Sequence, residues 1–145
     1  MDICIDFDGT CVTHDFPEVG KDIGAAPVLR RLVENGHRLI LFTMRADGQQ
    51  EQMINGYKFF AGDFLTQAVN WFKDNNIALY GIQRNPSQDQ WTISPKAYGH
   101  LYIDDAALGC PLAFNPKLSS RQYADWHVIE WMLEDMAILS PKITT

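Results

Sequence analysis

The chain lacks the cysteine patterns that mark disulfide-stabilised or zinc-binding proteins. It has three cysteines in 145 residues. They are Cys4, Cys11 and Cys110, and no two of them form a CxxC pair. Three scattered cysteines exclude a disulfide framework, and the spacing suits no zinc site. Cys4 stands inside an apolar run, which is typical of a small buried side chain rather than a nucleophile.

Long apolar runs and an excess of positive charge are also absent. No run approaches the roughly 18 apolar residues needed to cross a bilayer, so we expect no membrane association. The N-terminus, MDICIDFDGT, has no basic segment, which argues against a secretory signal and predicts a cytoplasmic location. The formal net charge is -6. Because an acidic surface repels polyanions, we expect no strong nucleic-acid binding.

What is present is the composition of an ordinary folded domain. Apolar residues make up 46% of the chain and charged residues 21%, as in typical globular proteins. A chain of this length suits one domain with one core. No repeat, low-complexity tract or linker divides it, so we predict a single domain over residues 1–145.

Short β-prone runs alternate with segments of helical spacing. Strands are expected at residues 3–5, 38–43, 77–82, 100–105 and 111–114, and helices at residues 24–36 and 64–75 and from Ser119 or Ser120 to about 139. The run LILF has four consecutive apolar residues, which is typical of a strand buried on both faces of a parallel sheet. The alternation predicts an α/β fold, a doubly wound, Rossmann-like, mostly parallel sheet with helices on both faces.

Two connections and the last helix have further implications. Residues 11–25 show little periodicity and are expected to form a flap, either a loop or a small hairpin. Residues 44–62 are polar at first and contain several glycines, so they form either a lid or a small inserted element. Trp126 and Trp131 exceed what one core face of the last helix needs. Core packing is the first interpretation and a homodimer interface the second.

Acidic and hydroxyl side chains stand where the predicted strands end. Asp6 and Asp8 close the first strand, Thr43 closes the second, and Asp104 and Asp105 close the fourth. In parallel α/β sheets the binding crevice lies beyond the carboxyl ends of the strands. We therefore expect these side chains to meet at one edge of the sheet.

Such a cluster of carboxylates requires a cation. Asp6, Asp8, Asp104 and Asp105 would repel one another unless a positive ion lay among them. Mg²⁺ fits, because it takes few protein carboxylates and leaves coordination positions for water and phosphate. The sequence therefore predicts a Mg²⁺ site at these four acids.

Other residues near the strand ends suit the oxygens of a phosphoryl group. Thr43 offers a hydroxyl, and Lys96, in the loop before the fourth strand, offers a compact positive charge. Gly9 and Thr10 lie in a tight turn whose backbone N–H groups are expected to form an anion-binding nest. Arg45, just past Thr43, either holds a substrate anion or faces water.

These motifs, in their order, resemble those of the haloacid dehalogenase-like hydrolase superfamily. The segments DFDGT, LILFT and a lysine ahead of LYIDD carry the resemblance, which spans residues 3–105. It implies that Asp6 is the nucleophile and Asp8 the general acid/base, whose main-chain carbonyl also touches the metal. An aspartate two residues after the nucleophile is typical of the phosphatases in this superfamily and is missing from the dehalogenases. The implied reaction is phosphate ester hydrolysis through an aspartyl-phosphate.

The same resemblance implies roles for the remaining residues. Thr43 would bind the phosphoryl group and Lys96 would neutralise its charge, with Lys58 as the alternative lysine. Asp104 would bind Mg²⁺, and Asp105 would be a ligand directly or through water. His14, in the flap, is the one histidine that we would test for substrate contact.

The short flap also resembles the small capless (C0-type) members of that superfamily. Their active sites are open and often serve large substrates or are closed by a neighbouring subunit. The resemblance therefore implies a Mg²⁺-dependent phosphoric monoester hydrolase with no large cap domain. The net negative charge favours a phosphorylated small molecule over a macromolecule as its substrate.

Two regulatory classes are the alternatives to an enzyme. A receiver-like module would be phosphorylated on an aspartate with little turnover, but in receivers the acid pair comes first and the lysine last. Here the acid pair of LYIDD follows Lys96. A degenerate phosphate-binding interaction protein is the other alternative, and the intact motifs argue against it.

Overall fold

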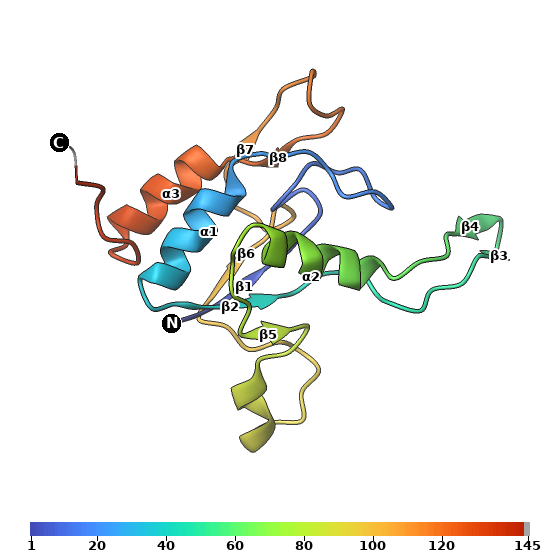
Figure 1. The fold of residues 1–145 in the computed structure, drawn as a ribbon, viewed down its shortest axis with the longest axis horizontal. Helices are drawn as coiled ribbons and strands as arrows, with labels where there is room; N and C mark the ends of the chain where they lie inside the picture. The colour runs from blue at the N-terminus through green and yellow to red at the C-terminus, as the bar shows by residue number, and fades with distance from the viewer. Residues whose placement is uncertain (144–145) are drawn as a thin grey trace.

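The centre of the computed structural model, which describes residues 1–143, is a four-stranded parallel sheet (Figure 1). The strands, in spatial order, are β5 (Gly81–Ile82), β2 (Arg38–Leu41), β1 (Asp2–Ile5) and β6 (Leu101–Ile103). Every neighbouring pair in this sheet is parallel. The carboxyl ends of all four strands therefore lie at the same edge, as the sequence predicts.

A single core joins one face of this sheet to the α-helices. The helices are α1 (Ala25–Glu34), α2 (Phe64–Asp74) and α3 (Trp126–Asp135). Ile3 and Ile5 of β1 are fully buried in a cluster that includes side chains from all three helices. Cys4, which points to the opposite face, packs instead with Ile40 and Ala97.

The α/β class, the parallel sheet and the lack of a large cap domain are confirmed, whereas the α-helical cover lies on one face. The β1–α1–β2 and β2–α2–β5 crossovers advance across the sheet in the same direction, and right-handed crossovers then place both helices on the same side. The return from β5 to β6 runs in the opposite direction through a short 3₁₀ helix, η1 (Pro86–Gln90). Ala97, later in this return, packs on the other face against Cys4 and Ile40.

The last helix begins later than its expected start near Ser119. Asp125 is the N-cap, and its side chain accepts a hydrogen bond from the Val128 N–H at 3.2 Å. This carboxylate satisfies one of the free donors of the first helical turn, which defines the start of α3. The segment before it forms β8 (Tyr123–Ala124), which pairs antiparallel with β7 (Leu112–Ala113) in a separate sheet.

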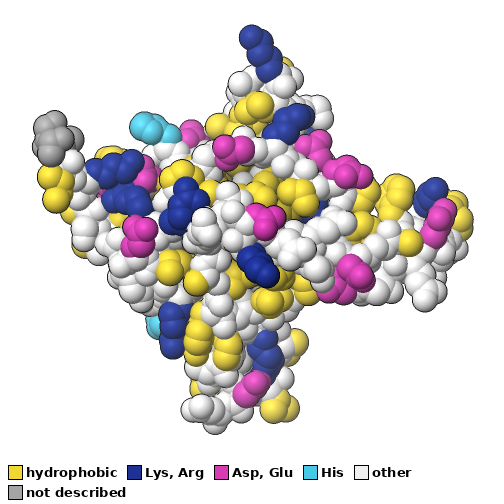
Figure 2. Space-filling view, viewed as in Figure 1, with side chains coloured by type: hydrophobic (Ala, Val, Ile, Leu, Met, Phe, Trp, Pro, Cys, Tyr) yellow, Lys and Arg dark blue, Asp and Glu magenta, His cyan; other side chains and the backbone are white. Residues whose placement is uncertain are grey.

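The connection over residues 44–62 contains a β-hairpin, here called the arm (residues 49–62). Strands β3 (Gln52–Ile54) and β4 (Tyr57–Phe59) pair antiparallel within it. Figure 1 shows the arm projecting away from the body beyond the start of α2. Its apolar side chains are exposed, and Figure 2 shows them beside charged groups at the tip.

The flap, residues 11–25, stays close to the body. Val12 forms isolated β-bridges with Asp8 on one side and Asp22 on the other. The ring of Phe16 packs edge-on against Phe64 at a centroid distance of 5.0 Å. Within residues 1–143, no helix has both the length and the apolar character that crossing a bilayer would require.

Candidate metal and phosphate site

Three carboxylates meet at the carboxyl edge of the sheet. Asp6, Asp104 and Asp105 each offer an oxygen within 4.8 Å of the others. Asp6 follows β1, and the two other acids follow the adjacent strand β6. The Asp6 N–H donates to Ile103 O at 3.0 Å, which holds the two strand ends level. Three of the four acids expected at a cation site therefore come together through their side chains.

The hydroxyl of Thr10 links the two halves of this cluster. Its Oγ1 lies 2.9 Å from Asp6 Oδ2 and 3.1 Å from Asp105 Oδ1, and it accepts a hydrogen bond from the Asp105 N–H at 3.0 Å. The main-chain carbonyl of Thr10 accepts a hydrogen bond from Trp126 Nε1 at 2.6 Å. Trp126 at the start of α3 thus helps to hold the DFDGT loop, a contact that no sequence pattern predicts.

The environment of Asp6 opposes its ionisation when no cation is bound. Burial, together with the neighbouring Asp104 carboxylate, raises the pKa of Asp6 to about 7, although the Thr10 hydroxyl acts in the opposite direction. A divalent ion among the three carboxylates would offset both effects. Carboxylate oxygens are the donors that Mg²⁺ prefers, so these residues fit that ion.

His14 connects the flap to the acid cluster. Its Nε2 lies 2.7 Å from Asp105 Oδ2. Gly9, with a φ of 80°, passes directly beneath this pair. A Cβ at Gly9 would overlap His14 Nε2 and lie 2.5 Å from Asp105 Oδ2. The close approach of flap and cluster therefore requires glycine at this position.

Gly9 and Thr10 do not provide the anion-binding nest expected from the sequence. The Gly9 N–H donates to Val12 O at 2.8 Å, and the Thr10 N–H donates to Phe7 O at 3.1 Å. Both amides close the turn, because a buried N–H must find an acceptor and the turn supplies one locally. The two residues shape the site through a tight backbone and a bridging hydroxyl.

The side chain of Asp8 lies outside the cluster and pairs with Arg45. Asp8 Oδ2 accepts from Arg45 Nε, and Asp8 Oδ1 accepts from Nη2, both at 2.8 Å. Arg45 is only 2% exposed. The sequence left two roles open for this arginine, binding a substrate anion or facing water. Its burial and its pairing with Asp8 support neither role. It is a buried partner of Asp8.

Thr43 lies at the end of β2 with its backbone held by Gln83. The Thr43 N–H donates to Gln83 Oε1 at 2.9 Å, and Gln83 Nε2 donates back to Thr43 O at 2.6 Å. The Thr43 hydroxyl accepts from the Arg45 N–H at 3.1 Å. Across residues 1–143 this hydroxyl has no acceptor of its own, so its proton is available for an anion. Gln83 lies in a loop with no sequence signal for this role.

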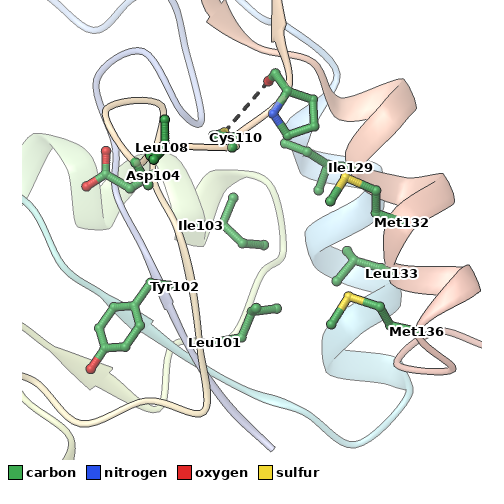
Figure 3. Close-up of a pocket in the computed structure, with 13 residues that line it drawn as sticks. Leu101, Tyr102, Ile103, Asp104, Leu108, Cys110, Ile129, Met132, Leu133 and Met136 are labelled. Carbon is green, nitrogen blue, oxygen red and sulfur yellow. Dashed lines mark hydrogen bonds between the residues drawn. The ribbon is translucent and has the colours of Figure 1, made fainter.

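Neither candidate lysine forms an ion pair with the acid cluster. Lys96 Nζ lies 5.4 Å from the centroid of the Tyr102 ring. Figure 3 shows Tyr102 and Asp104 on the same side of β6, away from α3, so Lys96 is on the side of the sheet to which Asp104 points. Lys58 lies on the arm and pairs with Glu51 at 3.2 Å.

An apolar cavity of about 220 Å³ lies beside β6, on the side that faces α3. It is lined mainly by β6, α3 and the loop after Asp104. Figure 3 shows Leu101 and Ile103 pointing toward this cavity and Asp104 pointing away from it. The Asp104 carboxylate therefore does not point into this cavity, although Asp104 is among its lining residues.

Comparison with known proteins supports the fold and leaves the activity open. No family model matches the chain, and no curated protein matches it. A solved structure of a conserved protein from Bacteroides thetaiotaomicron is similar, with a TM-score of 0.66 and 27% identity over 98% of both chains. The likeness extends over nearly the whole of each chain, so the α/β architecture without a large cap is common to both.

Proposed function

We propose that this protein is a Mg²⁺-dependent phosphatase that hydrolyses a phosphomonoester through an aspartyl-phosphate on Asp6. The observation that supports this most is the meeting of Asp6, Asp104 and Asp105 at one edge of the sheet, with oxygens within 4.8 Å of one another. The resemblance of their sequence motifs to haloacid dehalogenase-like phosphatases points to the same chemistry. A phosphorylated small molecule is the proposed substrate.

The metal ion would be held by the side chains of Asp6 and Asp104, with Asp105 as a direct or water-mediated ligand and the Asp8 carbonyl as a further donor. When bound, it would neutralise the negative charge of the phosphoryl group and keep Asp6 ionised. Thr43 would donate its hydroxyl proton to a phosphoryl oxygen. Lys96 is the proposed second source of positive charge for that group.

The reaction would proceed in two displacements at phosphorus. A carboxylate oxygen of Asp6 forms a bond to phosphorus while the bond to the leaving alcohol breaks, and Asp8 gives its proton to the leaving oxygen. Asp8 then takes a proton from water as the water oxygen attacks phosphorus. The bond between phosphorus and Asp6 breaks, which releases inorganic phosphate and regenerates both carboxyl groups.

One observation favours a second candidate, a phosphate-binding regulatory module with little turnover. Both carboxylate oxygens of Asp8 accept hydrogen bonds from Arg45. If this pairing blocked proton transfer, phosphorylated Asp6 would persist, as in a receiver. Repeated turnover distinguishes the enzyme from this module.

The test is turnover of 4-nitrophenyl phosphate with Mg²⁺ by the intact chain. We expect many turnovers per molecule, and a loss of about 10³-fold or more in Asp6→Asn, which lacks the nucleophile. Asp74→Asn, at the exposed end of α2, is the matched control and should keep full activity. Acid-quenched wild type should carry a phosphoryl group on Asp6. Unimpaired turnover by Asp6→Asn would refute the assignment, and a single turnover would favour the regulatory module.

A further inference from the structure

Arg45 makes a planar two-bond contact with Asp8. Nε and Nη2 donate to the two different carboxylate oxygens, each at 2.8 Å. The guanidinium matches a carboxylate in this geometry, so the fork fixes the plane of the Asp8 side chain as well as its position. Each carboxylate oxygen has two lone pairs, and the fork uses one on each. The remaining lone pairs can still exchange a proton.

The rest of the guanidinium is enclosed by groups from two other segments. Nη2 also donates to Glu18 O in the flap at 2.9 Å, and Nη1 lies 3.3 Å from Phe64 O at the start of α2. The rings of Phe7 and Phe16 each lie 5.1 Å from its Cζ. Arg45 therefore connects the flap, α2 and Asp8.

Burying an arginine this deeply is costly unless its donors are satisfied and its charge is paired. Only 1% of the Arg45 side chain is exposed, against 20% for its partner Asp8. The open side of the pair is thus the carboxylate. If the pair served only to stabilise the fold, nothing would require the Asp8 carboxylate to stay accessible.

We propose that Arg45 is a positioning residue for proton transfer by Asp8, an inference that rests on the proposed phosphatase function. Arg45 holds the Asp8 carboxyl at a fixed place and orientation while the substrate reacts at Asp6. Its donors are occupied by the protein, so it does not bind the phosphoryl group. The flap and α2 keep the guanidinium in place through Glu18 O and Phe64 O.

The chemistry of the leaving group separates this role from a structural one. An acid that protonates the leaving oxygen matters greatly for a poorly leaving alkyl alcohol and little for 4-nitrophenolate, which leaves as an anion. Hydrolysis of the aspartyl-phosphate also uses Asp8 and is common to both substrates, so the contrast is measured in kcat/KM, which reports the first displacement alone. We expect Arg45→Gln to lower kcat/KM by about 10²-fold for an alkyl phosphate and by only about threefold for 4-nitrophenyl phosphate. The inhibition constant of inorganic phosphate should stay within about twofold, because Arg45 does not touch the phosphoryl group.

Asp8→Asn should show the same contrast between the two substrates. Adding Arg45→Gln to Asp8→Asn should then cost little more, because the two residues act as a unit. Arg45→Lys keeps the charge but not the planar fork, so it should fall between wild type and Arg45→Gln. It also provides the test if Arg45→Gln fails to fold in thermal melts.

Arg31→Gln is the matched control for the loss of a paired arginine. Arg31 joins α1 to α3 through Glu130 at 2.7 Å and Glu134 at 2.9 Å, away from the DFDGT loop. It should reduce stability without favouring one leaving group over the other. Equal losses of kcat/KM on both substrates in the Arg45 variants, or a weakened inhibition by inorganic phosphate with unchanged kcat, would overturn the positioning role alone. A wild type that turns over neither substrate would overturn the proposed function and this role together.

Discussion

His14 Nε2 and Asp105 Oδ2 lie 2.7 Å apart, directly above Gly9. This pair joins the flap to the second acid of the YIDD segment across the DFDGT turn. The contact depends on how closely the backbone at residue 9 passes beneath it. The smallest residue in the motif therefore sets how closely the flap and the distant YIDD segment approach the DFDGT turn.

Replacing Gly9 by alanine should damage the fold and the site together. The new Cβ would collide with His14 and Asp105, and the positive φ of 80° would strain any other residue. We expect Gly9→Ala to lower the free energy of unfolding by about 3 kcal/mol, measured by urea denaturation. Gly36→Ala is the control, because φ is 86° there but nothing lies within 4 Å. It should cost only about 1 kcal/mol. Equal costs would show that the close approach is unimportant.

The stability gained from Mg²⁺ should depend on pH through Asp6. The pKa of Asp6 is raised from the ordinary value of 3.8 to about 7, so at a pH between these two pKa values the folded protein holds more protons than the unfolded chain. The contribution of Asp6 to stability is therefore fully present below the unfolded-state pKa and is lost as the pH rises through the folded-state pKa. Mg²⁺ replaces the proton, so it should raise Tm more at about pH 8 than at about pH 5.

Thermal melts with and without Mg²⁺ at the two pH values check this directly. Asp104→Asn is the informative variant, because it removes both a proposed ligand and the charge that helps to raise the pKa of Asp6. It should abolish most of the Mg²⁺ effect at either pH. The same Tm increase at both pH values in wild type would contradict the assignment of Asp6 as a ligand.

The two candidate lysines can be told apart by substitution. Lys96 packs over Tyr102, whose strand leads to Asp104, whereas Lys58 lies on the arm. We expect Lys96→Ala to lower turnover of 4-nitrophenyl phosphate by about 10²-fold and Lys58→Ala to change it by less than about twofold. The reverse result would place Lys58 in the working site and would require the arm to fold over the acids.

Shortening the arm tests whether it acts as a lid. Residues 50–61 are all exposed, and the base of the arm is closed by the Gly62 N–H donating to Gln49 O at 2.9 Å. Replacing this stretch with a short glycine-rich turn should change Tm by less than about 4 °C. Turnover of a small aryl phosphate should also change little, because the arm projects away from the body (Figure 1). A large fall in kcat/KM would show that the arm covers the site during the reaction.

The local sequence pattern was sufficient to predict the α/β class and the edge of the sheet at which the acids lie. The apolar runs before DFDGT and YIDD end at the same edge because parallel strands align their carboxyl ends, and this follows from alternation alone. The pairing of Ile5 with Ile103 then brings Asp6 next to Asp104. The uneven helical cover was not predicted, since it depends on the order in which the strands join the sheet.

Contacts between segments distant in the sequence decided the remaining geometry of the candidate site. The pairing of Arg45 with Asp8, the Trp126 hydrogen bond to Thr10 and the hold of Gln83 on Thr43 span 37, 116 and 40 residues. No periodicity or spacing encodes such pairs, because each forms only after packing has buried a polar group and required it to find a partner. The order of motifs along the chain therefore determined which chemical groups are present and at which edge of the sheet they lie. The tertiary structure decided which of these groups face the acids and which pair with one another.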